Sequence, residues 1–182
     1  NPSEDKWTKM ASMDASAVNC DSVVINNKIY SFNGTGLVTM SNPESSRTYS
    51  AVSGGGSPGS GYARSTLDSA ESWRPGTNNQ SQWMIIDTGQ MVTMNGVSCQ
   101  GRNVSFFDAD WLITAKFAYS IDGTNYIDIS GGEAITLGEA YNSAVNQYQV
   151  DLEKKQKIMF SSPVKGRYLK IIPWTWQGGI AL

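Results

Sequence analysis

The chain has 182 residues, with 14 Lys and Arg against 16 Asp and Glu, a formal net charge of −2, two cysteines and no histidine. This length suits one domain with an extension, which would bury roughly 70% of the surface of the unfolded chain. The charge balance gives no electrostatic footprint for nucleic acid or anionic lipid. Without histidine or a CxxC spacing, zinc sites and histidine-based catalysis are excluded, and no apolar run approaches the about 18 residues that a membrane span needs.

The N-terminal segment contains two short apolar runs. Val23–Ile25 and Lys28–Tyr30 flank Asn26-Asn27, and asparagine tolerates the positive φ of a tight turn. We therefore predict two strands here. We expect residues 1–44 to form an N-terminal extension packed on a main domain of residues 45–182.

A glycine-rich segment follows at Ser53–Gly61, with five glycines and one proline in nine positions. Such a composition cannot form the interior of a strand. We predict a surface loop.

The clearest periodicity belongs to residues 113–121. Ile113, Ala115, Phe117, Tyr119 and Ile121 alternate with polar residues that include Lys116. An alternation of period two indicates an antiparallel strand with one buried face.

Two further signals extend this reading. Asp122-Gly123 predicts a hairpin turn into Tyr126–Ile129, and Arg167–Ile172 predicts a strand ended by Pro173, which cannot donate to a ladder. Long helical periodicity is missing. The residues alone therefore predict an all-β sandwich.

Four motifs occur in a fixed order along the second part of the chain: Gln82–Gly89 (QWMIIDTG), Val97–Arg102 (VSCQGR), Trp111–Gly123 (WLITAKFAYSIDG) and Gly166–Pro173 (GRYLKIIP), followed by Trp176 and Ile180–Leu182. This series resembles the discoidin family, also called factor V/VIII type C domains. The resemblance implies a jelly-roll, galactose-binding-like β-sandwich that binds a partner and is not an enzyme. Because the family pattern continues beyond Leu182, we expect a module of a longer protein.

The resemblance places three loops at one end of the sandwich: Ser53–Gly61, Ser72–Ser81 and Arg102–Asp110, flanked by Gly138–Gln147. A rigid scaffold can present variable loops to a ligand. Sugars are recognised by directional hydrogen bonds to hydroxyls and by an aromatic ring that stacks on their C–H face. The candidate ligand-binding residues are Arg74, Asn78, Arg102, Asn103, Phe106, Phe107, Asp108, Asp110 and Tyr141.

Structural roles compete with these assignments. Phe106 and Phe107 could pack beneath their loop, Asp108 and Asp110 could cap turns, and Arg102 could satisfy loop carbonyls. The family pattern implies that Trp73 and Trp176 belong to the core.

A structural calcium ion is a further expectation from the resemblance. Glycan-binding relatives hold calcium with a loop that reads roughly D-G-x-x-T-x-W, and Asp68 and Ser72 occupy the corresponding oxygen-bearing positions here. Ser69 replaces the glycine of that pattern, and the late glutamate of the family would lie beyond Leu182.

The two cysteines leave two alternatives open. A disulfide between Cys20 and Cys99 would close a loop of about 80 residues and contribute on the order of 4 kcal/mol to stability. Alternatively, both are buried free thiols.

The function expected from these features is glycan recognition by a lectin-like, non-catalytic module of a secreted or cell-surface adhesion protein. Its partner would be a glycan or glycoprotein, and it would bind no nucleic acid. The alternative is a protein-interaction module that binds a receptor or a neighbouring domain through the same loops or the N-terminal extension. Phosphatidylserine binding is disfavoured, because no basic ring surrounds Phe106 and Phe107.

Overall fold

The computed structural model describes residues 22–25, 28–31, 39–100, 110–137 and 155–182. The chain divides into two compact units, Asn1–Met40 and Ser41–Leu182. In the first unit, β1 (Ser22–Ile25) pairs antiparallel with β2 (Lys28–Ser31), with Ile25 opposite Lys28. This confirms the two predicted strands. The packing of residues 1–44 on the sandwich stays a prediction.

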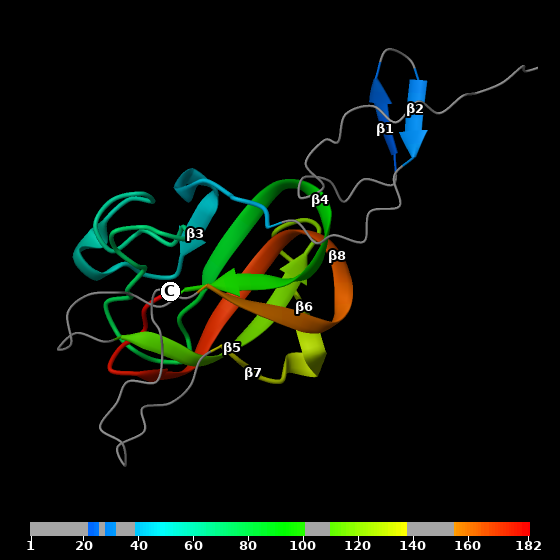
Figure 1. The fold of residues 1–182 in the computed structure, drawn as a ribbon. Coiled ribbons are helices and arrows are strands. Elements are labelled where there is room, and N and C mark those ends of the chain that lie inside the picture. The colour runs from blue at the N-terminus through cyan, green and yellow to red at the C-terminus, as the bar shows by residue number, and fades with distance from the viewer. Residues whose placement is uncertain (1–21, 26–27, 32–38, 101–109, 138–154) are drawn as a thin grey trace, which may run out of the picture. The chain divides into compact units, whose positions relative to one another are not determined.

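The second unit is built almost entirely of antiparallel strands (Figure 1). Its sheet has the order β3-β4-β8-β5-β6, and β7 pairs with β5 as well. Within the described residues no helix is long and apolar enough to cross a membrane. The elements are η1 (Glu44–Ser46), β3 (Arg47–Tyr49), η2 (Ser53–Gly55), β4 (Met84–Cys99), β5 (Trp111–Ser120), β6 (Ile127–Asp128), η3 (Ile129–Gly132), β7 (Ile135–Thr136) and β8 (Gln156–Gln177).

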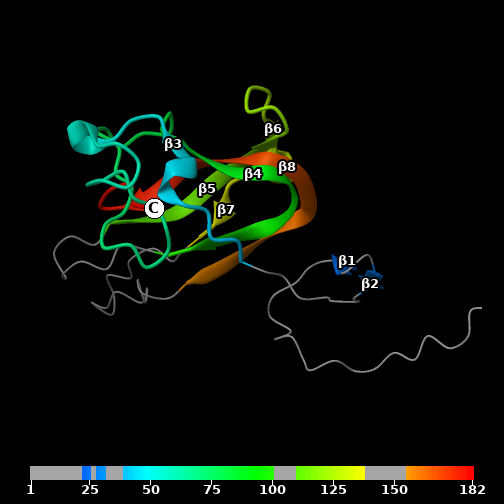
Figure 2. The same cartoon turned by 90° about the horizontal axis from the view of Figure 1, so that it is seen from above.

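The two long strands, β4 and β8, create the two layers of the sandwich. Their pairing is interrupted between Asp87 and Val92, and Figure 2 shows both strands bending there, so that each passes from one layer to the other. Gly89 takes a φ of 77° at this bend, a left-handed conformation that favours glycine. Further along, a Cβ on Gly96 would lie 2.0 Å from the carbonyl oxygen of Ile158, so the close approach of the two strands requires glycine.

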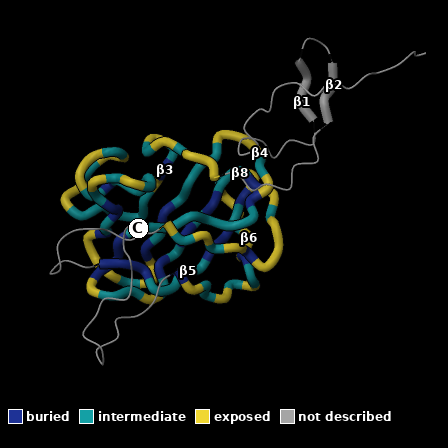
Figure 3. The backbone as a smooth tube through the Cα atoms, in the orientation of Figure 1, coloured by how far each residue is buried: buried dark blue, intermediate teal, exposed yellow. Residues whose placement is uncertain are grey.

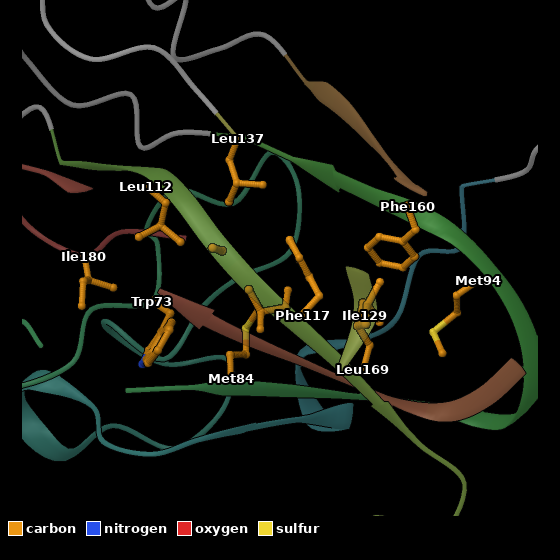
Figure 4. Packing of buried hydrophobic residues seen from close by; sticks show 12 residues of the cluster. Trp73, Met84, Met94, Leu112, Phe117, Ile129, Leu137, Phe160, Leu169 and Ile180 are labelled. Atoms are coloured by element: carbon orange, nitrogen blue, oxygen red, sulfur yellow. The ribbon is translucent and has the colours of Figure 1, made fainter. Parts of the chain in front are cut away.

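The core lies between the two layers (Figures 3 and 4). Phe117 of β5 packs against Phe160 of β8, with ring centroids 5.4 Å apart. Leu169 and Met84 belong to the same buried cluster, and each buried side chain of this kind contributes about 1.5–3 kcal/mol. The cluster continues to Trp73 and Ile180 at one end of the sandwich.

The predicted alternation along β5 is confirmed from Ala115 to Tyr119, since Ala115 and Phe117 are buried and Tyr119 packs against the core. The assignment of Ile113 to this face was wrong: Leu112 belongs to the buried cluster instead, because the pairing with β8 shifts between Leu112 and Thr114.

The assignment of Ile121 to the same buried face was wrong: the strand ends at Ser120, and Ile121 is 61% exposed. The cause is the Asp122 side chain, whose Oδ1 accepts hydrogen bonds from the backbone N–H groups of Thr124 and Asn125 and turns the chain.

Pro173 does not end a strand, which corrects a second expectation. β8 continues through it to Gln177. The ladder with β5 is irregular here, because Ala115 lies opposite Pro173 while Thr114 lies opposite Thr175. A proline is tolerated at such an irregularity, since no regular ladder bond is lost. The glycine-rich segment, in contrast, forms the predicted loop, with one short turn of 3-10 helix.

Candidate ligand-binding site at the loop end

Loops gather at the end of the sandwich opposite the bend of β4 and β8. Residues 50–83 and 178–182 lie there in both views (Figures 1 and 2). Trp73 links two of these segments by hydrogen bonds. Its backbone N–H donates to Leu182 O at 2.9 Å, and its indole Nε1 donates to Ala51 O at 2.8 Å. The Trp73 side chain is fully buried, as the family pattern implied. The burial and hydrogen bonds of Trp73 therefore fix the backbone position of the next residue, Arg74.

Arg74 is held from several sides. Its backbone N–H donates to Tyr62 O at 3.1 Å, and its carbonyl accepts from Ser53 N at 2.8 Å. Its guanidinium Nη2 lies 2.8 Å from Asp110 Oδ2, and its Cζ lies 5.2 Å from the centroid of the Tyr62 ring. The Arg74 side chain keeps 32% of its surface exposed, whereas Asp110 keeps 11%. Asp110 therefore orients a guanidinium that still faces solvent.

Gly179 lies against both the Asp110 carboxylate and Asn78. Asn78 Oδ1 accepts a hydrogen bond from Ile180 N at 3.1 Å. A Cβ on Gly179 would lie 3.1 Å from Asp110 Oδ1 and 3.3 Å from Asn78 Nδ2, so a larger residue would push these groups aside. We call Tyr62, Arg74, Asn78, Asp110 and Gly179 the Arg74 site.

The chemistry of the Arg74 site suits hydroxyl groups. The guanidinium and the Asn78 amide are donors, the Asp110 carboxylate is an acceptor, and the Tyr62 ring is an apolar surface. Directional polar groups beside an aromatic ring are typical of sites for small polar ligands. The carboxylate also balances the charge of the guanidinium, which favours a neutral ligand over an anion.

The structure thus brings together three of the residues proposed from the sequence: Arg74, Asn78 and Asp110. The remaining proposed ligand-binding residues lie outside the described part of the chain: Arg102, Asn103, Phe106, Phe107, Asp108 and Tyr141. Sequence reasoning missed Tyr62 and Gly179. An aromatic residue directly after a glycine-rich loop was the available signal for Tyr62.

Glu44 holds the loop that carries Tyr62, a role that no sequence pattern indicated. Its Oε1 accepts from Ser65 N at 2.8 Å, from Thr66 N at 3.0 Å and from Thr66 Oγ1 at 2.9 Å. Tyr49 OH lies 2.8 Å from Ser65 Oγ, and burial raises the pKa of Tyr49 to about 12. This network fixes the loop on which Tyr62 lies against Arg74.

The proposed calcium ligands fit a cation only in part. Ser72 Oγ is buried without a hydrogen-bond partner, as an oxygen ligand of a cation would be. The Asp68 carboxylate, however, is exposed and already pairs with the Lys155 ammonium, whose hydrogen bond lowers the pKa of Asp68. Gln100 Nε2 also donates to Asp68 Oδ1, at 3.3 Å. Across the described ranges no three His, Cys, Asp or Glu residues cluster as a metal site would require, so calcium at this loop stays a prediction.

Cys99, at the end of β4, has no disulfide partner among the described residues. Burial raises its pKa to about 12, which keeps the thiol protonated. Its proposed disulfide partner, Cys20, lies outside the described residues, so their pairing stays a prediction.

Comparison with known proteins identifies relatives of this scaffold. Over 119 residues the chain is 28% identical to discoidin-2 of Dictyostelium discoideum, an alignment that covers 65% of this chain and 40% of the relative. Over 110 residues it is 27% identical to lactadherin of Sus scrofa, which covers 60% of this chain and 25% of the relative. The chain therefore spans less than half the length of these curated relatives.

Solved structures share the fold. Recombinant discoidin II of Dictyostelium discoideum matches with a TM-score of 0.54 and 20% identity, covering 74% of this chain and 51% of that one. The family 32 CBM of Clostridium perfringens NanJ, solved in complex with galactose, matches with a TM-score of 0.51 and 14% identity, covering 76% of this chain and 90% of that one. The predicted galactose-binding-like β-sandwich is therefore confirmed.

A family model adds the decisive match, because the F5/8 type C domain model aligns with residues 44–182, well over half of the sequence. The chain belongs to the F5/8 type C (discoidin) domain family.

Proposed function

We propose that this chain is a glycan-binding module that recognises neutral sugars through the Arg74 site. The observation that carries this proposal is the partly exposed Arg74 guanidinium, oriented by Asp110 and Tyr62 among the loops at one end of the sandwich. Two relatives of the same fold support the ligand class, since their structures were solved with galactose and with GalNAc-β-1,3-galactose. The proposal assigns no catalytic step to the chain.

Each group of the Arg74 site has a role in this proposal. Arg74 and Asn78 donate to sugar hydroxyls, and the Asp110 carboxylate accepts from one hydroxyl while it orients Arg74. Tyr62 offers its ring to the C–H face of the sugar. We expect the other residues proposed from the sequence to complete the site: Arg102, Asn103, Phe106, Phe107, Asp108 and Tyr141.

The expected affinity for one sugar is weak. A shallow site of this kind gives a Kd of about 0.1–1 mM, or about −4 to −5.5 kcal/mol. Repetition of the module in a longer protein would raise the avidity. We place that protein outside the cell or on its surface, where it would contribute to adhesion by binding glycans or glycoproteins.

A glycan array probed with the full chain tests this function. We expect galactose-containing neutral glycans among the hits, and loss of these hits in Arg74→Ala. Arg167→Ala is a matched control, because Arg167 also pairs with a carboxylate, that of Asp87 at 2.7 Å, and lies over a ring, that of Tyr168. Its pair lies at the opposite end of the sheet, where β4 and β8 bend. Equal binding by both variants would contradict the proposal.

A second candidate is protein interaction through the N-terminal extension. The separate compact unit Asn1–Met40, with its own β1–β2 hairpin, favours it. Removal of residues 1–40 distinguishes the two: glycan binding through the Arg74 site should survive the deletion, whereas capture of a protein receptor by the extension should be lost.

A further inference from the structure

The outer face of the sheet, which points away from the core, carries a second group of aromatic and basic residues. In β8, Leu169 and Ile171 point inward, so their neighbours Lys170 and Ile172 point outward. Lys170 lies opposite Ala118 of β5, and Lys116 lies opposite Ile172. Lys116 and Lys170 are therefore diagonal neighbours on one face, with Cβ atoms roughly 7–8 Å apart.

Three aromatic rings hold these two lysines. Lys170 Nζ lies 5.3 Å from the centroid of Trp83 and 5.2 Å from that of Tyr126. Lys116 Nζ lies 3.8 Å from the centroid of Trp174. All five side chains are half-buried. We call Trp83, Lys116, Tyr126, Lys170 and Trp174 the lysine–aromatic face.

Among the described residues, the two ammonium groups contact aromatic rings and form no ion pair. Of the carboxylates in the described part of the chain, none lies within ion-pair distance of Lys116 or Lys170. Two carboxylates are diagonal neighbours of these lysines in the sheet, Asp128 of Lys116 and Asp87 of Lys170. Neither forms an ion pair with its lysine, and Asp87 pairs with Arg167 instead. Cation–π contacts fix the lysine side chains and reduce the entropy that they lose when an anion binds.

We propose that the lysine–aromatic face is a second binding site, for a glycan that carries carboxylate groups. Two ordered ammonium groups match carboxylates spaced along an oligosaccharide, and the flanking rings match its apolar C–H faces. The ligand class rests on the proposed function, but the site is separate from the Arg74 site, whose own carboxylate disfavours anions.

Other polyanions fit this face less well. Nucleic-acid binding typically uses about 6–10 phosphate contacts, and recognition of anionic membranes uses clusters of about 4–8 basic residues. The face offers Lys116 and Lys170 on a chain with a net charge of −2. A sparsely charged ligand with stacking surfaces is the better match.

Oligogalacturonate is a suitable probe, and its methyl ester is a matched neutral ligand with the same sugar. We expect the acid form to bind the full chain, to change tryptophan fluorescence through Trp83 and Trp174, and to bind at least about tenfold more tightly than the ester. Lys116→Gln with Lys170→Gln should weaken binding by a similar factor. Lys157→Gln with Lys165→Gln, two exposed lysines of the first half of β8, should leave it unchanged.

Several outcomes would overturn this second site. Equal affinity for the acid and the ester would show that the charge of the ligand does not contribute to binding. An equal loss of affinity in both double variants would show that Lys116 and Lys170 are not the lysines that bind the ligand. Tighter binding of duplex DNA, sulfated glycan or phosphatidylserine vesicles would show the wrong ligand class. If Arg74→Ala abolished oligogalacturonate binding, the acid would occupy the Arg74 site, whereas loss of neutral-sugar binding alone would leave the second site intact.

Discussion

The guanidinium of Arg74 lies 2.8 Å from the carboxylate of Asp110, a pair that joins the loop after Trp73 to the start of β5. Asp110 is mostly buried, so the Asp110→Asn substitution keeps the shape but leaves Arg74 without its counter-charge. We expect a loss of about 1–2 kcal/mol in the free energy of unfolding, between the values for exposed and buried pairs, and weaker sugar binding. Urea unfolding measures the first effect and calorimetry the second.

Asp87→Asn is the control for this substitution, because Asp87 pairs with Arg167 far from the loops. It should alter stability but leave sugar affinity unchanged. If Asp110→Asn bound sugar as wild type does, Asp110 would have no part in orienting Arg74.

The loop held by Glu44 provides a second prediction. Glu44→Gln removes the charge that strengthens the hydrogen bonds from the backbone of Ser65 and Thr66. We expect unfolding to become easier by about 1–3 kcal/mol and the amides of these two residues to exchange faster with solvent. Hydrogen-exchange NMR reads both amides directly, and unchanged protection would show that other contacts hold the loop.

Lys155 determines how calcium would act on Asp68. The Lys155 ammonium already pairs with the Asp68 carboxylate, so calcium must displace the ammonium to bind there. We expect calcium to raise the melting temperature more in Lys155→Ala than in wild type, because a ligand that binds the folded state stabilises it more as its affinity rises. Lys157→Ala is the control. The same response in wild type and Lys155→Ala would separate any calcium site from Asp68.

Alkaline pH should destabilise the fold. The pKa values of Cys99 and Tyr49 both rise to about 12 in the folded chain, from ordinary values of 9.0 and 10.0, because burial penalises their charged forms. Raised acidic pKa values mean that the stabilisation is complete below about pH 9 and is lost as the pH rises toward 12. Urea unfolding across this range should show the decline, and Cys99→Ala should show a smaller one. A flat profile would contradict the burial of both groups.

Local sequence patterns predicted most of the fold. Alternation along β5 identified Ala115 and Phe117 as core residues, because a strand places successive side chains on opposite faces. The same pattern failed at Ile121, where the Asp122 side chain competes for backbone N–H groups and ends the strand. The strand end expected at Pro173 was wrong because the ladder is irregular there, and an irregular ladder tolerates a residue that cannot donate a hydrogen bond.

The candidate site could be predicted from the sequence only in part. Arg74 and Asp110 each had a suitable side chain in a suitable loop, but their pairing depends on tertiary contacts between distant segments. Glu44 acts through contacts that no local pattern records, and the position of Tyr62 after a glycine-rich loop does not show that its ring meets Arg74. The lysine–aromatic face needs the register of β5 against β8, which makes Lys116 and Lys170 diagonal neighbours.

NMR titration of the ¹⁵N-labelled full chain with galactose tests the central claim most directly. Glycan recognition at the loop end predicts saturable shifts of the backbone amides of Tyr62, Arg74 and Gly179, with a Kd of about 0.1–1 mM. The amides of Asp87 and Arg167, at the far end of the sheet, should not move. Shifts confined to that far end, or none at sugar concentrations well above this Kd, would contradict the account.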